Sequence, residues 1–402
     1  MLVQKYKDML SGKSVIRQLS EFATARGREI GYENVFDYSL GNPSVPVPRE
    51  FTDEMIRMLT QMETNELHGY SPSLGITSVR EAVAASLEKR FGLPYRREHI
   101  FMASGAAGAL AHAFRLVTEP GDEVLTFAPF FPEYRPYVDL TGAVLKVVPP
   151  DTESFQIHFD KFEEMLTEKV MAVLINTPNN PSGVVYSRET LKRLSDLLRE
   201  KSARYGHTIY LISDEPYREI VFQGVEAPCV SAFYDDTIMC YSFSKSLSIP
   251  GERIGYVAVN PHCKDAEDMI NMCGQISRGT GHNCPPSIIQ LAVAKVLDTT
   301  ADLSVYERNM EILYGELRSL GFRCVKPGGT FYIFPRALEE DAGAFCRKAL
   351  KYDLVLVPGD TFGAPGYFRM AYCIDTEKVE RSLGALHKFV REEYQCPCIR
   401  QD

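Results

Sequence analysis

One lysine in this chain lies among groups that could bind an aldehyde bearing a phosphate. Lys245 follows an apolar, strand-like run at 237–241, and Ser242, Ser244 and Arg253 lie close to it in the sequence. A lysine amine forms an imine with an aldehyde, and hydroxyl groups together with a guanidinium bind a phosphate ester. Pyridoxal phosphate is such an aldehyde, so the segment predicts an anchor for this cofactor. An exposed lysine in a polar loop is the ordinary alternative, because most lysines are solvated.

Polar residues that follow two other apolar runs match what the ring of this cofactor requires. Asp214 follows the run 208–213, where a carboxylate can keep a pyridinium nitrogen protonated, and Tyr217 could reach the ring oxygen or the imine. Asn180 lies in a turn rich in proline and glycine after the run 171–175, so its amide is held where it could bond the ring oxygen. An acidic turn and a tight surface turn remain the alternatives for these two segments.

Two further segments could complete a cofactor site. Gly105, Ala106 and Ala107 begin a helical pattern after the run 100–103, and small residues there let a phosphate approach the free amides of a helix N-terminus. Their spacing matches neither the dinucleotide-binding fingerprint nor a Walker loop. Phe131 follows another predicted strand and could stack on a flat ring. Close helix–sheet packing would explain the small residues equally well, and an aromatic core cluster would explain Phe131.

A single arginine stands in an apolar setting late in the chain. Arg369 lies within the run 367–372, whose other members are aromatic or apolar. An arginine in such a setting usually binds a carboxylate. That partner is either a structural Asp or Glu or the α-carboxylate of a substrate.

The elements that must position these residues follow an alternating pattern from about residue 100. Strands alternating with helices predict an α/β fold, with a mostly parallel seven-stranded sheet flanked by helices. Ligands of such sheets bind beyond the carboxyl ends of the strands, where the polar residues above are expected. The segment 187–201 has helical periodicity, with Ser187 as its predicted N-cap. The predicted strands are 100–103, 123–128, 143–148, 171–176, 208–213, 237–241 and 256–259.

The length of 402 residues exceeds what one hydrophobic core usually serves, so two domains are expected. We predict a large cofactor-binding domain at 49–286 and a smaller α+β domain that combines 1–48 with 287–402. A long helical stretch is expected at about 287–319, after two consecutive prolines.

Composition excludes several classes of protein. A net charge of −9 without a long basic run argues against a nucleic-acid partner. Charges at the N-terminus argue against a signal peptide, and no apolar stretch is long enough for a bilayer, so a cytoplasmic protein without a membrane partner is expected. The ten cysteines lack zinc-ligand spacing, which predicts no metal site. The close pair Cys396 and Cys398 is interpreted as reduced thiols in a tail.

Taken in this order, the segments from about 37 to 371 resemble the class I and II aminotransferases of pyridoxal-phosphate fold type I. The resemblance implies that Lys245 is the Schiff-base lysine and the base that moves the substrate proton. It also implies that Asp214 holds the pyridinium and that Asn180 and Tyr217 bond the ring oxygen.

The same resemblance implies the remaining roles. Arg369 would bind the substrate α-carboxylate, aided by Asn180 and the backbone near Gly41. Family members are typically homodimers with shared active sites, and Tyr70 would reach the phosphate held by the neighbouring subunit. The phosphate would otherwise be held by Gly105, Ala106, Ala107, Ser242, Ser244 and Arg253.

The resemblance leaves the substrate open. Many aspartate-specific relatives have a lysine at the place of Ala107. Arg278 of a partner subunit is one candidate to replace that lysine, and a surface arginine in a glycine-rich loop is the other interpretation. Aromatic, branched-chain and alanine-like donors also remain open.

The leading prediction is ping-pong transamination between an α-amino acid and a 2-oxo acid, with 2-oxoglutarate as the acceptor. C–S β-lyases share these residues, but their turn commonly has a histidine where this chain has Asn179. A transcription regulator of the same fold would need a DNA-binding domain ahead of Asp37, where only a short segment exists.

Overall fold

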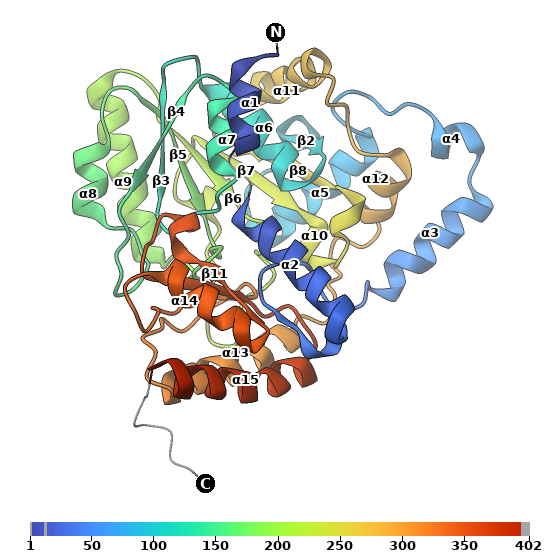
Figure 1. The fold of residues 1–402 in the computed structure, drawn as a ribbon. Coiled ribbons are helices and arrows are strands. Elements are labelled where there is room, and N and C mark those ends of the chain that lie inside the picture. Colours follow the sequence, from blue (N-terminus) through green and yellow to red (C-terminus); the bar gives the residue numbers. More distant parts are fainter. Residues whose placement is uncertain (1, 12–13, 395–402) are drawn as a thin grey trace.

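A seven-stranded sheet forms the centre of the molecule in the computed structural model, which describes residues 2–11 and 14–394 (Figure 1). In their side-by-side order, its strands are β2 (Ile100–Ala103), β8 (Gly255–Val259), β7 (Thr237–Ser242), β6 (Tyr210–Asp214), β5 (Val170–Asn176), β3 (Glu123–Phe127) and β4 (Val144–Val148). The strands from β7 to β4 run parallel, whereas β8 is antiparallel to both β2 and β7. The predicted mostly parallel, seven-stranded sheet is confirmed.

Helices cover both faces of this sheet. Successive residues of a strand point to opposite sides, so Leu211 of β6 packs in one buried cluster with Leu194, while Ile212 packs in another with Leu110. Burial on both faces explains why the central strands β5, β6, β7 and β8 are mostly apolar along their length. The helices beside the sheet are α5 (Thr77–Phe91), α6 (Gly105–Val117), α7 (Tyr134–Asp139), α8 (Phe159–Met165), α9 (Arg188–Tyr205), α10 (Phe243–Ser246), α11 (Ala266–Thr280) and α12 (Ser287–Val293).

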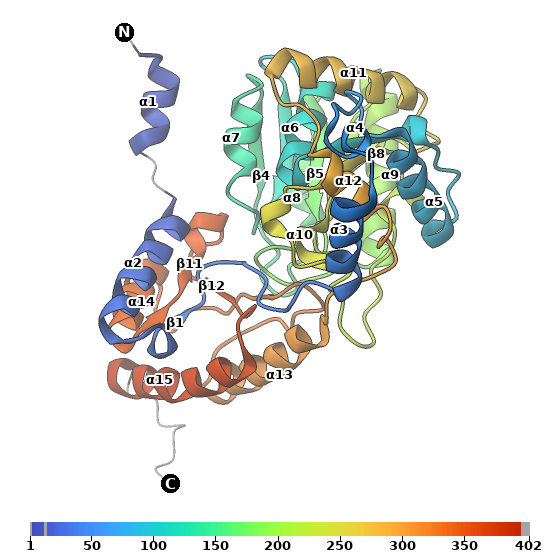
Figure 2. The same ribbon diagram turned by 90° about the vertical axis from the view of Figure 1, so that its right-hand side faces the viewer.

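A second group of elements joins the two ends of the chain, and Figure 2 shows it beside the large sheet. Its strands β11, β12 and β9 form an antiparallel sheet, and β1 pairs in parallel with β10. Ala23 and Val35 pack against Val355, which holds the N-terminal segment on the C-terminal elements. The group consists of α2 (Val15–Ile30), β1 (Phe36–Asp37), α13 (Ser304–Ser319), β9 (Tyr332–Ile333), α14 (Ala342–Ala349), β10 (Leu354–Val355), β11 (Val357–Pro358), β12 (Phe368–Ala371) and α15 (Thr376–Tyr394).

Three N-terminal helices lie at the margins of the molecule. They are α1 (Gln4–Ser11), α3 (Arg49–Gln61) and α4 (Thr64–His68). Both α3 and α4 project to one side, at the right of Figure 1. Met58 of α3 is buried in a cluster with Ile289 of α12, whereas Ile56 and Leu59 are exposed.

One helix prediction is confirmed and another is wrong. Ser187 caps α9, because its Oγ accepts a hydrogen bond from the Thr190 amide at 3.0 Å. The expected single helix at 287–319 is instead two helices, α12 and α13, separated by residues 294–303. The Asp302 carboxylate accepts hydrogen bonds from both the amide and the hydroxyl of Ser304, which fixes a turn before α13 begins. Cys396 and Cys398 lie outside the described residues.

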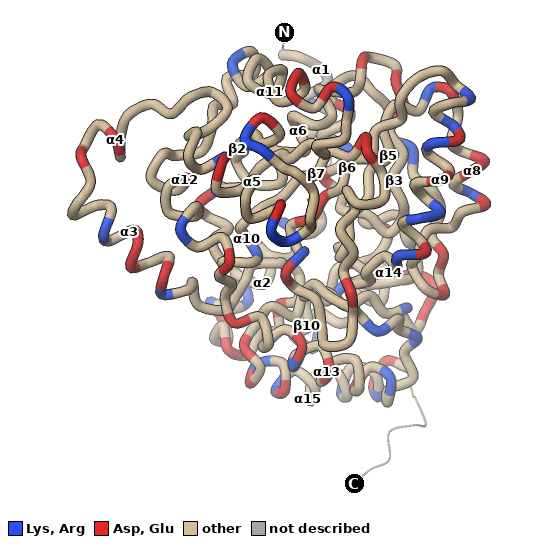
Figure 3. The backbone as a smooth tube through the Cα atoms, turned by 180° about the vertical axis from the view of Figure 1, so that it is seen from behind, with Lys and Arg blue, Asp and Glu red and all other residues tan. Residues whose placement is uncertain are grey.

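Charges of both signs alternate along the outer helices, as the view from behind shows (Figure 3). Lys192 pairs with Asp196 on α9, and Lys351 pairs with Glu393 of α15. Some of the charge on these two helices is therefore neutralised by neighbouring side chains. Within the described part of the chain, every helix is too short or too polar to cross a bilayer.

Candidate active site

A cavity of about 650 Å³ lies where β5, β6 and β7 end, and elements of the second group form its opposite wall. Its location agrees with the general position of ligand sites in parallel sheets. Most of the predicted site residues line it: Gly41, Ala106, Ala107, Phe131, Asn180, Asp214, Tyr217, Ser242, Ser244, Lys245, Arg253 and Arg369.

Two predicted cofactor residues and one candidate substrate residue lie outside that lining. Gly105 immediately precedes Ala106 at the start of α6. The side chain of Tyr70 is fully exposed and does not reach the cavity of its own chain. Arg278 is exposed near the C-terminus of α11 and is also absent from the cavity wall.

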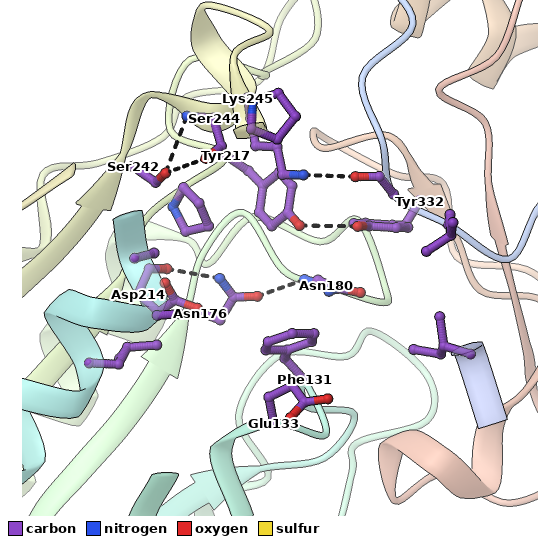
Figure 4. Close-up of a pocket in the computed structure, with 18 of the residues that line it drawn as sticks. Phe131, Glu133, Asn176, Asn180, Asp214, Tyr217, Ser242, Ser244, Lys245 and Tyr332 are labelled. Carbon is purple, nitrogen blue, oxygen red and sulfur yellow. Dashed lines mark hydrogen bonds between the residues drawn. The ribbon is translucent and has the colours of Figure 1, made fainter. Parts of the chain in front are cut away.

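Lys245 projects its amine toward the opposite wall of the cavity (Figure 4). The residue belongs to the short helix α10 directly after β7, and its Nζ donates a hydrogen bond to the Gly41 carbonyl at 2.7 Å. Burial lowers the pKa of the amine to about 8, and the positive charges of Arg253 and Arg369 act in the same direction. Lys245 is therefore a usable nucleophile and base close to neutral pH.

This shift predicts how the cofactor-free protein takes up pyridoxal phosphate. Only the neutral amine attacks an aldehyde, and a pKa lowered from 10.5 to about 8 leaves half of the amines neutral at about pH 8. The uptake rate should rise about tenfold per pH unit below this value and level off above it. Stopped-flow absorbance between pH 6 and 10 measures the profile. A rate still rising steeply above pH 9 would show that the amine keeps its ordinary pKa.

Asp214 is a buried carboxylate with one oxygen left unpaired. It ends β6, and its Oδ2 accepts a hydrogen bond from the Tyr134 hydroxyl at 2.5 Å. Its Oδ1 is buried and has no hydrogen-bond partner among the described residues. Burial raises the pKa of Asp214 to about 7, because a lone anion is costly in the interior. A cationic ligand at Oδ1 would supply the missing partner and stabilise the ionised carboxylate.

Donors for an anion gather near the N-terminus of α6. The Ser242 hydroxyl donates to Ser244 Oγ at 2.7 Å, and Arg253 donates from Nη1 to the Pro250 carbonyl at 2.9 Å. Within the described ranges, Arg253 forms no ion pair with a carboxylate. Gly105 has a φ of +73°, and a Cβ atom there would lie 3.0 Å from the Arg253 guanidinium. The glycine therefore allows the guanidinium to approach the first amides of α6, an arrangement suited to a phosphate.

Arg369 is a buried cation without a carboxylate partner in the part of the chain that is described. Its side chain is 2% exposed, and its guanidinium donates to the Asn180 side-chain oxygen at 3.1 Å and to the Ser39 carbonyl. Its Nε is buried without an acceptor, and its guanidinium carbon lies 4.6 Å from the centre of the Tyr332 ring. A buried charge that is incompletely paired is costly, so this site favours an anionic ligand.

Several residues at the site were missed by sequence reasoning. Tyr134 holds Asp214, Tyr332 shares a 3.1 Å hydrogen bond with Tyr217, and Asn176 donates from Nδ2 to the Asp214 carbonyl at 2.8 Å. Asn176 also accepts from the Asn180 amide at 2.7 Å through its side-chain oxygen. Tyr134 and Asn176 stand at the ends of predicted strand-loop segments, which was a usable signal. Tyr332 comes from the other wall, and its approach depends on how the two groups of elements pack.

Around one cavity, the described residues therefore combine a half-buried lysine, a carboxylate with one unpaired oxygen, a cluster of donors for an anion, and an arginine that has no carboxylate partner. The family model described as "Aminotransferase class I and II" matches residues 33–386, which is most of the chain. The chain belongs to the class I and II aminotransferases. This finding confirms the family that the sequence resembles.

Relatives of this aminotransferase align with it over almost its whole length. It is 30% identical over 391 residues to a protein from Thermotoga maritima named aspartate aminotransferase, a match covering 94% of this chain and 99% of that protein. It is also 30% identical to aromatic-amino-acid aminotransferase 2 of Thermococcus litoralis, with 94% and 96% covered. A crystal structure of an amino transferase from Eubacterium rectale superposes with a TM-score of 0.95 at 43% identity, covering 98% of this chain and 100% of that one.

The aminotransferase depends on pyridoxal phosphate and moves an amino group between an α-amino acid and a 2-oxo acid. The site fits the cofactor on its own chemistry. The unpaired Oδ1 of Asp214 suits a pyridinium, and the donors near Arg253 suit a phosphate ester. The predictions of enzyme class and cofactor are confirmed.

Proposed function

We propose that Lys245, Asp214 and Tyr217 are the catalytic residues of this aminotransferase. The observation that carries the proposal is the half-buried Lys245 amine, whose pKa is lowered to about 8, in the same cavity as the unpaired Asp214 Oδ1. Pyridoxal phosphate, when bound, supplies an aldehyde that joins covalently to amines and a ring that draws electrons from the substrate Cα. The remaining cofactor contacts would come from Gly105, Ala106, Ala107, Phe131, Asn180, Ser242, Ser244 and Arg253.

The protein groups then have separate tasks. Lys245 anchors the cofactor and, when its amine is free, takes the proton from the substrate Cα. Asp214 holds a proton on the ring nitrogen, because its carboxylate is ionised beside a cation. The hydrogen bond to Tyr332 holds the Tyr217 hydroxyl, which would donate to the ring oxygen of the bound cofactor. Arg369 binds the substrate α-carboxylate, which fixes the direction of the Cα–H bond toward Lys245.

Replacing Arg369 with lysine is expected to raise KM for amino acids about 100-fold, with a smaller effect on kcat. A lysine keeps the positive charge but cannot make two parallel hydrogen bonds to a carboxylate. Steady-state kinetics measures the effect, with Arg28→Lys on the exposed side of α2 as the matched control. An unchanged KM in Arg369→Lys would remove Arg369 from the substrate site.

We propose 2-oxoglutarate as the amino acceptor and a ping-pong sequence of two half-reactions. One cavity holds the lysine and the arginine, so both substrates must use it in turn. Relatives are named for aspartate and for aromatic amino acids, which supports trying dicarboxylic and aromatic amino acids as donors.

We further propose that the enzyme is a homodimer in which Tyr70 completes the phosphate site of the partner subunit. Tyr70 is fully exposed and does not line the cavity of its own chain, and exposed Ile56 and Leu59 lie on the projecting helix α3. We also propose that the enzyme is cytoplasmic. It has two domains in this proposal, one at 49–286 and one that combines 1–48 with 287–402.

Complementation between mutant subunits tests the shared site. Tyr70→Phe alone should weaken pyridoxal phosphate binding about tenfold, since it removes one hydrogen bond to a charged group. In a hybrid of Tyr70→Phe with Lys245→Ala, one site would combine an intact Lys245 with an intact Tyr70. Co-expressed hybrids should therefore recover the affinity of the unmodified enzyme at that site. If the hybrids bind pyridoxal phosphate as weakly as Tyr70→Phe alone, Tyr70 does not act across subunits.

A further inference from the structure

The cavity contains two charged side chains that the proposed mechanism leaves unused. Lys245, Asp214, Arg253 and Arg369 serve the cofactor and the α-carboxylate in the proposed function. The remaining charged residues of the lining are Glu133 and Arg17.

Glu133 presents a carboxylate that the fold itself does not use. The residue directly precedes α7, yet its side chain makes no capping hydrogen bond to that helix. No ion pair or side-chain hydrogen bond of Glu133 is found within residues 2–11 and 14–394. The side chain is half-buried in the cavity wall. Its negative charge is therefore free to meet a ligand.

The position of Glu133 in the cavity wall suits contact with the side chain of a bound substrate. Figure 4 shows Glu133 beyond the ring of Phe131 when viewed from Lys245. Since Arg369 would fix the α-carboxylate and Lys245 would face Cα, the side chain of a bound amino acid is left to extend toward the cavity wall. Because Glu133 lines the same cavity, its carboxylate offers a hydrogen-bond acceptor to a long substrate side chain that carries an N–H or O–H group.

Arg17 provides the opposite charge from the other wall of the same cavity. It belongs to α2 and its side chain is 82% exposed, and among the described residues its ion pair is the exposed one with Glu21 at 3.3 Å. Such a pair contributes little and is easily exchanged for another carboxylate. Glu133 and Arg17 therefore offer one cavity two alternative polar contacts of opposite sign.

We propose that these two residues divide the recognition of the two substrates. Glu133 binds an amino donor whose side chain ends in a hydrogen-bond donor, and Arg17 binds the distal carboxylate of a dicarboxylic 2-oxo acid. The inference rests on the proposed function, because it assumes that both substrates occupy this cavity. It also accounts for a dicarboxylate substrate in a chain that has Ala107 where many aspartate-specific relatives have lysine.

Separate half-reactions of the pyridoxal-phosphate-loaded enzyme test the assignment. Glutamine and methionine have similar lengths but end in a hydrogen-bond donor and in an apolar group. In Glu133→Gln, the ratio of glutamine to methionine single-turnover efficiency should fall about tenfold, as expected for loss of one partly exposed charge. Glu377→Gln, exposed on α15 and outside the cavity, is the charge-matched control.

The acceptor half-reaction gives the complementary result. Arg17→Gln should lower the efficiency of 2-oxoglutarate relative to 2-oxobutyrate about tenfold, while leaving glutamine unchanged. Equilibrium binding of glutarate, which cannot react, should weaken in Arg17→Gln but not in Glu133→Gln. Normal thermal unfolding of each variant would confirm that it folds.

The outcomes separate failure of this inference from failure of the proposed function. If the unmodified enzyme transaminates but both selectivity ratios stay unchanged in the variants, the division of recognition is wrong and the function stands. If a single residue governs both ratios, the two contacts are not separate and the inference is equally overturned. If no amino acid converts the cofactor to its amino form, the proposed function itself fails.

Discussion

Lys245→Ala is expected to lower the rate of transamination at least about 10³-fold, because one change removes the cofactor anchor and the base for the Cα proton. Its amine points into the cavity, donates to the Gly41 carbonyl at 2.7 Å and has a pKa lowered to about 8 by burial. Single-turnover absorbance with saturating amino acid measures the proton-transfer step directly.

Two controls separate chemistry from folding in this experiment. Lys264→Ala removes an exposed lysine beyond the end of β8 and should leave the rate unchanged. Added methylamine should restore part of the Lys245→Ala rate, since a small amine can occupy the vacated space and accept the proton. A variant that retains more than about a tenth of the normal rate would show that another group is the base.

Asp214→Asn is expected to lower kcat/KM about 10²- to 10³-fold, even though the substitution preserves the shape of the side chain. The unpaired Oδ1 is buried beside the cavity, and burial raises the pKa of the carboxyl to about 7. A ring cation at Oδ1 would lower this pKa and keep the carboxylate ionised. An asparagine cannot supply the negative charge, so the ring nitrogen should lose its proton and withdraw electrons less strongly.

Tyr134→Phe perturbs Asp214 more mildly than Asp214→Asn does, so the two variants can be compared. It removes the 2.5 Å hydrogen bond to Oδ2 but keeps the carboxylate, so an effect of about tenfold or less is expected. The absorption spectrum of the bound cofactor should report ring protonation in both variants. An Asp214→Asn enzyme with normal kcat/KM and an unchanged spectrum would show that Asp214 only supports the fold.

The sequence predicted the parts of the site that lie in strand-loop segments. Asp214, Asn180 and Lys245 follow apolar runs, and the carboxyl ends of neighbouring parallel strands meet at one edge of the sheet. Local patterning therefore indicated both the fold class and the group of residues. The resemblance to a family supplied the roles that residue chemistry left open, such as that of Arg369.

Other features depend on packing that no local pattern reveals. The bond between Tyr217 and Tyr332 joins residues 115 positions apart, from opposite walls of the cavity. The Glu133 side chain makes no capping hydrogen bond to α7, and the sequence alone does not reveal this. The break between α12 and α13 arises from a turn at Asp302, inside a segment whose apolar spacing favours a continuous helix. In each case the outcome is decided by contacts between distant or competing groups.

Titrating the purified, cofactor-loaded enzyme with amino acids in a visible spectrometer tests the central claim most directly. A band near about 420 nm from the Lys245-linked cofactor should disappear as the amino form of the cofactor accumulates, and 2-oxoglutarate should restore it. Release of pyruvate from cysteine-type substrates without the amino form would instead indicate an elimination enzyme. Failure of the loaded band to form at all, even with added pyridoxal phosphate, would contradict the assignment of Lys245.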